Sequence, residues 1–266
     1  MPYTKKSNRK QSPRLYMQSS RRSRSMVAPY VKEYVKAAIH RQIENKKFDI
    51  IAINQSVPTT QTSLGLVPFS VNLFPNIGIG SKNGERIGYS VNPRKVMIKG
   101  HCNLRPYSAS TNKYLPVKVK FWICSYKVNN RNAVTLTSTD FDRYFDTAGT
   151  SVGFQGNMID TIADVNKQEW VVYQTKTMTL GQTSVASTSA TTLTSYDASR
   201  FQVPFAFDVS KHFKSKLEYL DDLPSRPTNR NLFMFVQAVS AEGSSEGGVA
   251  IPVELHYRHT FEYEDA

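Results

Sequence analysis

Apolar side chains recur at every second position along most of this chain, and that period restricts what it can fold into. The clearest example is residues 251–264, IPVELHYRHTFEYE, where Val253, Leu255 and Phe261 fall on one face and polar residues fall mostly on the other. Successive side chains of a β-strand point to opposite faces, whereas a helix needs a period near 3.6. The segment is therefore predicted to be a strand with one face in a core and the other in solvent.

The same alternation occurs in several earlier segments. In residues 94–104 the apolar face would carry Val96, Ile98, Cys102 and Leu104, and the polar face Lys95, Lys99 and His101. In residues 116–126 the apolar face would carry Val117, Val119, Phe121 and Ile123, and the polar face Lys118, Lys120 and Trp122. Further strands are predicted at 48–54, 169–180, 201–209 and 231–239.

Seven or eight strands, with no second helical pattern of any length, predict an all-β sandwich or barrel over residues 48–266. Three long connections interrupt it. Residues 65–86 are rich in Gly, Asn and Pro, and residues 127–168 contain the helix-like TDFDRYFD. Residues 183–195 have nine Ser or Thr in thirteen positions and are predicted to be exposed. Long loops of this kind usually carry contacts rather than stability.

Net positive charge is concentrated at the N-terminus. Residues 1–26 hold eight basic and no acidic side chains, and residues 27–47 add five basic and two acidic ones, so this part of the chain carries +11. The remaining 219 residues hold 21 basic and 19 acidic side chains, a net charge of +2. A basic tail on a balanced body is typical of a protein that binds a polyanion with its tail.

The basic segment divides into two parts. Residues 1–28 have too little apolar surface to offset the entropy of ordering and are predicted to be a disordered arm. Residues 29–47 are predicted to form an amphipathic helix, because Pro29 suits a first helical turn and apolar residues then recur at helical spacing. Those apolar residues are Val31, Val35, Ala38, Ile39 and Ile43.

The basic side chains of both parts are the candidate nucleic-acid ligands, since Lys and Arg bind phosphates by charge alone and release counterions. They are Lys5, Lys6, Arg9, Lys10, Arg14, Arg21, Arg22, Arg24, Lys32, Lys36, Arg41, Lys46 and Lys47. Tyr3 and Tyr16 are candidates for stacking on unpaired bases. Alternatives are a solvated tail, a mitochondrial presequence, or a helix lying on an anionic membrane. The run from Arg21 to Arg24 also fits a nuclear import signal, which is compatible with nucleic-acid binding.

No motif argues for an enzyme, a cofactor or a metal site. The glycine-rich residues 78–88 match neither a phosphate loop nor a dinucleotide fingerprint. His256 and His259 lie three apart in a strand and so point to opposite faces. Cys102 and Cys124 are assigned by the same alternation to the apolar and polar sides, which disfavours a disulfide. The acidic cluster Asp140, Asp142 and Asp146 fits a helix cap better than a calcium loop. No apolar run is long enough to span a bilayer, so membrane insertion is not expected.

A basic, acid-free arm followed by a β domain with uneven long loops resembles the coat proteins of circular Rep-encoding single-stranded DNA viruses, the circovirus-like group. Residues 86–104, RIGYSVNPRKVMIKGHCNL, and 117–126, VKVKFWICSY, are similar in style to an early strand pair of those proteins. The resemblance implies a single eight-stranded jelly-roll β-sandwich and a T=1 icosahedral shell of sixty copies with the arms on a packaged DNA genome. It also implies assembly in the host nucleus, contact with import machinery and a cell-surface receptor. The eight implied strands are 48–55, 87–105, 115–127, one within 134–146, 168–180, 200–210, 231–240 and 250–263.

Two other functions stay open from the sequence. One is a coat protein of a small RNA virus, because the charge of the arm does not distinguish DNA from RNA. The other is a cellular RNA- or DNA-binding β-domain protein, which requires basic and aromatic residues together on an exposed sheet face. Lys118, Lys120 and Trp122 would supply such a face.

Overall fold

The computed structural model describes residues 30–34, 44–57, 68–104, 117–127, 136, 138–147, 150–181, 201–220, 222–240 and 253–265. The chain consists of two compact units, residues 1–42 and residues 43–266. Within the first unit, residues 30–34 are helical, and within the second almost every described element is a strand. No helix among the described residues is long and apolar enough to cross a membrane.

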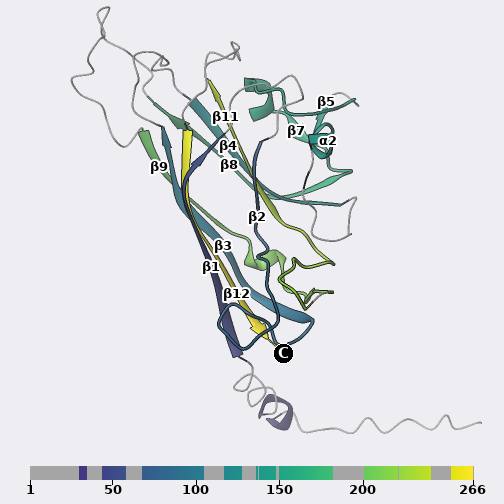
Figure 1. The fold of residues 1–266 in the computed structure, drawn as a ribbon. Coiled ribbons are helices and arrows are strands. Elements are labelled where there is room, and N and C mark those ends of the chain that lie inside the picture. Colours follow the sequence, from purple (N-terminus) through teal and green to yellow (C-terminus); the bar gives the residue numbers. More distant parts are fainter. Residues whose placement is uncertain are drawn as a thin grey trace, which may run out of the picture. The chain divides into compact units, whose positions relative to one another are not determined.

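Residues 43–266 form two antiparallel sheets that pack face to face (Figure 1). The first sheet contains β1 (Glu44–Ser56), β12 (Val253–Asp265), β3 (Ser90–Leu104) and β9 (Gln202–Asp208), hydrogen-bonded in that order. The short strand β10 (Leu217–Glu218) continues along the same edge of β3 as β9. The second sheet contains β2 (Phe69–Asn72), β11 (Phe233–Ser240), β4 (Val117–Tyr126) and β8 (Trp170–Leu180).

The strand order identifies the fold as a jelly roll. Numbered along the chain with the two-residue β10 left out, the eight strands of the two sheets run 1-8-3-6 in the first sheet and 2-7-4-5 in the second. Each sheet thus alternates strands from the two halves of the chain, which is the order produced by a hairpin of paired strands rolled into a sandwich. The predicted eight-stranded jelly-roll β-sandwich is confirmed by this order.

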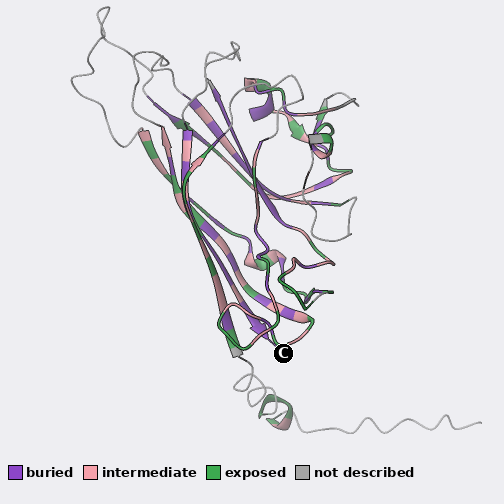
Figure 2. Cartoon of the chain, in the orientation of Figure 1, coloured by how far each residue is buried: buried purple, intermediate pink, exposed green. Residues whose placement is uncertain are grey.

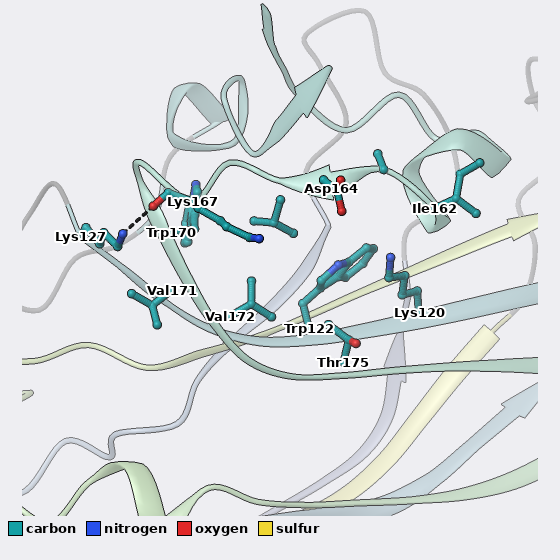
Figure 3. A pocket seen from close by; sticks show the side chains of 12 residues that line it. Lys120, Trp122, Lys127, Ile162, Asp164, Lys167, Trp170, Val171, Val172 and Thr175 are labelled. Atoms are coloured by element: carbon teal, nitrogen blue, oxygen red, sulfur yellow. Dashed lines mark hydrogen bonds between the residues drawn. The ribbon is translucent and has the colours of Figure 1, made fainter. Parts of the chain in front are cut away.

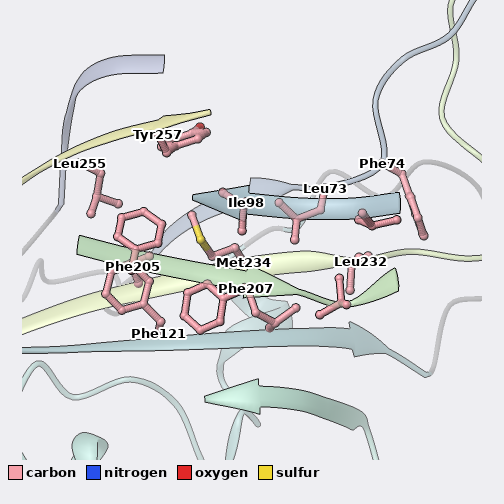
Figure 4. Close-up of a cluster of buried hydrophobic side chains, with 14 of the residues drawn as sticks. Leu73, Phe74, Ile98, Phe121, Phe205, Phe207, Leu232, Met234, Leu255 and Tyr257 are labelled. Carbon is pink, nitrogen blue, oxygen red and sulfur yellow. The ribbon is translucent and has the colours of Figure 1, made fainter. Parts of the chain in front are cut away.

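The core between the sheets is built from the inward faces of the alternating strands (Figure 4). Phe121 of β4 contacts Phe205 and Phe207 of β9, with ring centroids 4.8 and 5.6 Å apart. Cys102 lies in this core, and burial raises the pKa of its thiol to about 12. Val96, Ile98 and Cys102 are buried while Lys99 and His101 are exposed, as the period of two predicted.

A second, smaller core covers the outer face of the second sheet. It is formed by the excursion between β4 and β8, which contains α2 (Ser138–Phe141), β5 (Phe145–Thr147), β6 (Thr150–Val152), η1 (Met158–Thr161) and β7 (Asp164–Val165). The aromatic rings of Tyr144, Phe145 and Phe154 pack on Trp122 of β4. As a result both faces of β4 are buried from Phe121 to Cys124, whereas Lys118 and Lys120 stay partly exposed (Figure 2).

We call the excursion between β4 and β8 the cover, and the buried carboxylate of Asp160 joins it to the second sheet. Asp160 accepts hydrogen bonds from the backbone N–H groups of Gln155 and Gly156 and from the side-chain amide of Gln237 on β11. These three donors compensate the removal of the carboxylate from water, and Asp160 is only 2% exposed. The cover is therefore anchored to the sandwich by a specific polar contact as well as by aromatic packing.

Three details of the predicted organisation are corrected. Residues 44–47 belong to β1 rather than to the helix predicted over 29–47, so the β body starts earlier than residue 48. The second strand of the fold is β2, in a segment predicted to be a loop, so 87–105 and 115–127 are the third and fourth strands. The strand implied within 134–146 is not part of the sandwich, because this segment holds α2 and the start of β5, and β5 pairs with β6 and β7 in a separate three-stranded sheet.

The other four implied strands, 168–180, 200–210, 231–240 and 250–263, agree with β8, β9, β11 and β12 to within three residues at each end. The segments 1–28, 35–43 and 183–195 lie outside the described residues, so the disordered arm, the rest of the helix and the exposed Ser/Thr segment stay predictions.

Candidate nucleic-acid interface

Most of the predicted nucleic-acid ligands lie outside the described residues. These are Lys5, Lys6, Arg9, Lys10, Arg14, Arg21, Arg22, Arg24, Lys36 and Arg41. Lys32 is exposed on the helix over residues 30–34, as binding to a phosphate requires. Lys46 and Lys47 lie on β1, where the structure defines the surroundings of each.

Lys46 is wrongly predicted as a phosphate ligand. Its ammonium group lies 3.1 Å from Oδ2 of Asp265, and the two side chains are 1% and 0% exposed. Strands β1 and β12 pair with Glu44 opposite Asp265, so the interaction joins the beginning of one strand to the end of the other. A lysine that is buried and paired with a carboxylate cannot reach a nucleic acid, and its role is structural.

The side chain of Lys47, the next residue of β1, points away from the core. Its ammonium group is 3.0 Å from Oδ2 of Asp49, which also accepts from the guanidinium of Arg258 at 2.8 Å. Hydrogen bonds from Arg258, Thr260 and Lys47 hold the pKa of the Asp49 carboxyl well below its usual range. The side chain of Lys47 is 39% exposed, so it stays a candidate ligand with part of its charge balanced by Asp49.

The face of β4 that carries Lys118, Lys120 and Trp122 is not an open platform for bases. Trp122 is fully buried beneath the cover described above. The ammonium of Lys120 donates to the carbonyl of Thr161 at 2.7 Å and lies 5.0 Å from the centroid of the Trp122 ring. The expectation of an exposed aromatic on this face is therefore wrong, which removes the aromatic residue that favoured a cellular RNA- or DNA-binding protein.

A groove of about 480 Å³ remains open beside this covered face, between the cover and the outer side of β8 (Figure 3). Lys120, Lys127 and Lys167 line it, with Asp164 as an acidic neighbour. Lys127 donates to the carbonyl of Lys167, whereas the side chain of Lys167 extends into the groove. Three lysines against one carboxylate give the lining a net positive charge, which favours an anion such as a phosphate. The sequence did not indicate this group, because Lys127 and Lys167 lie 40 residues apart and come together only where the ends of β4 and β8 pair.

The outer face of the first sheet carries a second basic group. Lys99 pairs in register with Arg258, and His101 pairs with His256, across β3 and β12. Arg258 is engaged by Asp49, while Lys99 is exposed. The alternation had placed Lys99 and His101 on one polar face, and the structure confirms it.

His259 lies on the opposite face of β12 from His256, as the period of two predicted, and cannot share a metal ion with it. No group of three or more His, Cys, Asp or Glu that could hold a metal ion occurs within the described part of the chain. His259 is fully buried, and among those residues neither ring nitrogen has a hydrogen-bond partner. Burial lowers the pKa of His259 to about 4, against a smaller opposing effect of Asp49.

This histidine predicts a specific loss of stability in mild acid. The unfolded chain binds a proton at His259 near pH 6.5, whereas the folded chain resists it until about pH 4, so the stabilisation present above pH 6.5 is lost as the pH falls through this window. The shift corresponds to about 3 kcal/mol of unfolding free energy. Denaturant unfolding of wild type and His259→Leu at pH 7 and pH 4.5 should show a smaller loss in the variant. The exposed His101→Gln serves as the control, and equal pH dependence in wild type and His259→Leu would contradict the assignment.

No family model matches the chain, and no curated protein matches it. Among solved structures, one titled Desmodium yellow mottle tymovirus is similar over 84% of this chain and 81% of its own, with 11% identity and a TM-score of 0.31. Another, titled an unassembled KI polyomavirus VP1 pentamer, is similar over 84% of this chain and 95% of its own, with 11% identity and a TM-score of 0.25. Likenesses this remote carry no argument, and the jelly-roll assignment rests on the strand order.

Proposed function

We propose that this chain is a viral capsid protein that assembles into a small icosahedral shell and packages a single-stranded genome, DNA in the first instance, through its basic N-terminal arm. The observation that carries the proposal is the separation of charge from fold. The first 47 residues, of which only the last four lie in β1, carry +11, and the rest of the jelly-roll body is close to neutral. The sheets supply a rigid unit for a shell, and the arm supplies affinity for a polyanion.

In an assembled shell the positive charges of many arms would repel one another unless a polyanion neutralises them, whereas a monomer has no such requirement. Sixty arms in one cavity would bring together roughly 660 positive charges, which must be neutralised by a polyanion. Burial of Lys46 against Asp265 removes one basic side chain per copy from that total. Packaged nucleic acid is the natural counterion, and Lys99 and the groove lysines are secondary contacts that the folded body could add.

Localisation follows from the same proposal. The chain would reside in the virion, and the run Arg21-Arg22-Ser23-Arg24 would direct it to the host nucleus for assembly with the genome. The protein would also meet import machinery and a cell-surface receptor. No catalytic step is assigned to it, because neither the sequence nor the described groove presents a nucleophile with an adjacent base.

The deciding experiment is expression of the full chain, followed by electron microscopy and nuclease digestion of the purified product. The proposal expects uniform spherical particles that contain nuclease-protected nucleic acid. Sensitivity of the extracted nucleic acid to DNase or RNase then separates a DNA virus from an RNA virus. A monodisperse monomer without nucleic acid would overturn the capsid function.

A further inference from the structure

Exposed apolar side chains lie on two loops of the sandwich, one between β2 and β3 and the other between β10 and β11. They are Ile79, Ile87, Tyr89, Leu220 and Leu223, which are 39%, 63%, 57%, 66% and 74% exposed. We call this group the loop patch. Single exposed apolar residues are ordinary on a protein surface, but five large ones on two adjoining loops are characteristic of an interaction site.

The two loops are tied to each other by backbone and side-chain hydrogen bonds. The N–H of Ile79 donates to the carbonyl of Asp222 at 3.2 Å, and the N–H of Tyr219 donates to the carbonyl of Tyr89 at 2.8 Å. The hydroxyl of Tyr89 donates to Oδ1 of Asp222 at 2.7 Å. The two loops are therefore held side by side, which brings the residues of the loop patch together from distant parts of the chain.

A buried arginine, Arg86, holds the backbone of the first loop in place through hydrogen bonds. Arg86 is 0% exposed, and its guanidinium donates to the carbonyls of Ile77 and Gly88 at 3.1 and 2.6 Å. The guanidinium also lies 4.7 Å from the ring centroid of Tyr219 and 5.7 Å from that of Tyr89. This arrangement fixes the backbone that presents Ile87 and Tyr89, so a partner binding here would not have to order it.

Exposed charged residues lie next to the apolar ones along the chain, in keeping with the polar rim of a typical protein interface. Lys82 and Asp222 are exposed on the same two loops, and Glu218 is exposed at the end of β10, where the second loop begins. Five large side chains at these exposures present several hundred Å² of surface, a substantial part of the ~800 Å² that each partner buries in a stable interface. The loop patch is thus large enough to be the centre of a protein–protein contact.

We propose that the loop patch is a contact surface between copies of this chain in the assembled shell; this inference rests on the proposed capsid function. A second copy is the favoured occupant because the loop patch is flanked by both signs of charge, Lys82 against Glu218 and Asp222, so two copies can place opposite charges against each other. The body beyond residue 47 has 21 basic and 19 acidic side chains, so the repulsion between two bodies is small. Nucleic acid is disfavoured at this surface, because its centre is apolar and its rim carries both signs of charge.

Charge placed in the loop patch tests the inference. Leu223→Glu is expected to raise the protein concentration needed for assembly by more than about tenfold, because a carboxylate would be buried in the contact. The matched control is Ile159→Glu, which places the same charge at a side chain that is 61% exposed and outside the loop patch. Light scattering of the full chain at a series of concentrations measures both. Equal assembly of Leu223→Glu and wild type would overturn the inference, as would an equal loss in Ile159→Glu.

Cysteine labelling tests the same surface without a disruptive charge. Cys102 and Cys124 are both free and buried, so an introduced cysteine can be followed with a maleimide. Leu223→Cys should react at least about tenfold more slowly in particles than after their dissociation, whereas Ile159→Cys should react at similar rates in both. Equal reactivity of Leu223→Cys in the two states would overturn the inference. Failure of wild-type protein to form particles would instead overturn the proposed function.

Discussion

Deletion of residues 1–26 is expected to remove most of the sequence-independent affinity for single-stranded nucleic acid while leaving the β body folded. The deleted segment holds eight basic and no acidic side chains, and the body begins at β1, downstream of the cut. If all eight side chains contact phosphates, the slope of log affinity against log salt should fall by roughly 0.7 per lost contact, about five to six in total. Titrations of labelled single strands at several salt concentrations measure this slope.

Two variants separate charge from other properties of the arm. Replacing every Arg in residues 1–26 by Lys should change affinity little, because counterion release depends on charge rather than on bidentate geometry. Tyr16→Ala should cost about 1–3 kcal/mol of binding free energy if the ring stacks on a base. An undiminished affinity and slope after deletion would place binding on the body, where the groove lined by Lys120, Lys127 and Lys167 is the next candidate.

Lys46→Met is expected to lower the free energy of unfolding by about 3–5 kcal/mol, the usual cost of leaving one member of a buried ion pair without its partner. The Asp265 carboxylate is 0% exposed and would keep its charge far from water. Its Oδ2 also accepts a hydrogen bond from the backbone N–H of Ile87. We therefore expect Lys46→Met to destabilise the contact between the end of β12 and the loop over residues 77–89 as well. Denaturant unfolding followed by circular dichroism measures the effect.

A double variant and a surface pair make this result interpretable. Lys46→Met combined with Asp265→Asn should recover much of the lost stability, because no buried charge is then left unpaired. Arg258→Met breaks the exposed pair with Asp49 and should cost less than about 1 kcal/mol. A loss as small as this in Lys46→Met would show that water reaches the Lys46–Asp265 pair.

Alternation of apolar and polar residues was enough to predict the strands that have one buried face. β3 follows this pattern closely and β12 follows it from Val253 to His259. The inward residues Val96, Ile98 and Leu255 are in the core. The period also placed Cys102 inside and separated His256 from His259 correctly. These predictions succeed because the side-chain direction in a strand depends only on position along the backbone.

The same reasoning failed where burial depends on distant parts of the chain. β2 has only four residues, FSVN, in a segment of Gly, Asn and Pro, and it becomes a strand through hydrogen bonds to β11, more than 160 residues away. Trp122 was predicted to be exposed because it alternates with Phe121, but the excursion before β8 covers it. Alternation shows which face of a strand a residue occupies, and a second layer decides whether that face meets water.

By itself, the sequence determined the all-β class, the inward residues of the long strands and the concentration of charge in the first 47 residues, because strand period and net charge are local properties of the chain. Only the tertiary structure decided the strand order, the aromatic cover over β4, the pairing of Lys46 with Asp265 and the union of two loops in the loop patch. Each of these joins residues far apart in the sequence, and packing selects such contacts by shape and by the need to compensate buried charges and hydrogen-bonding groups.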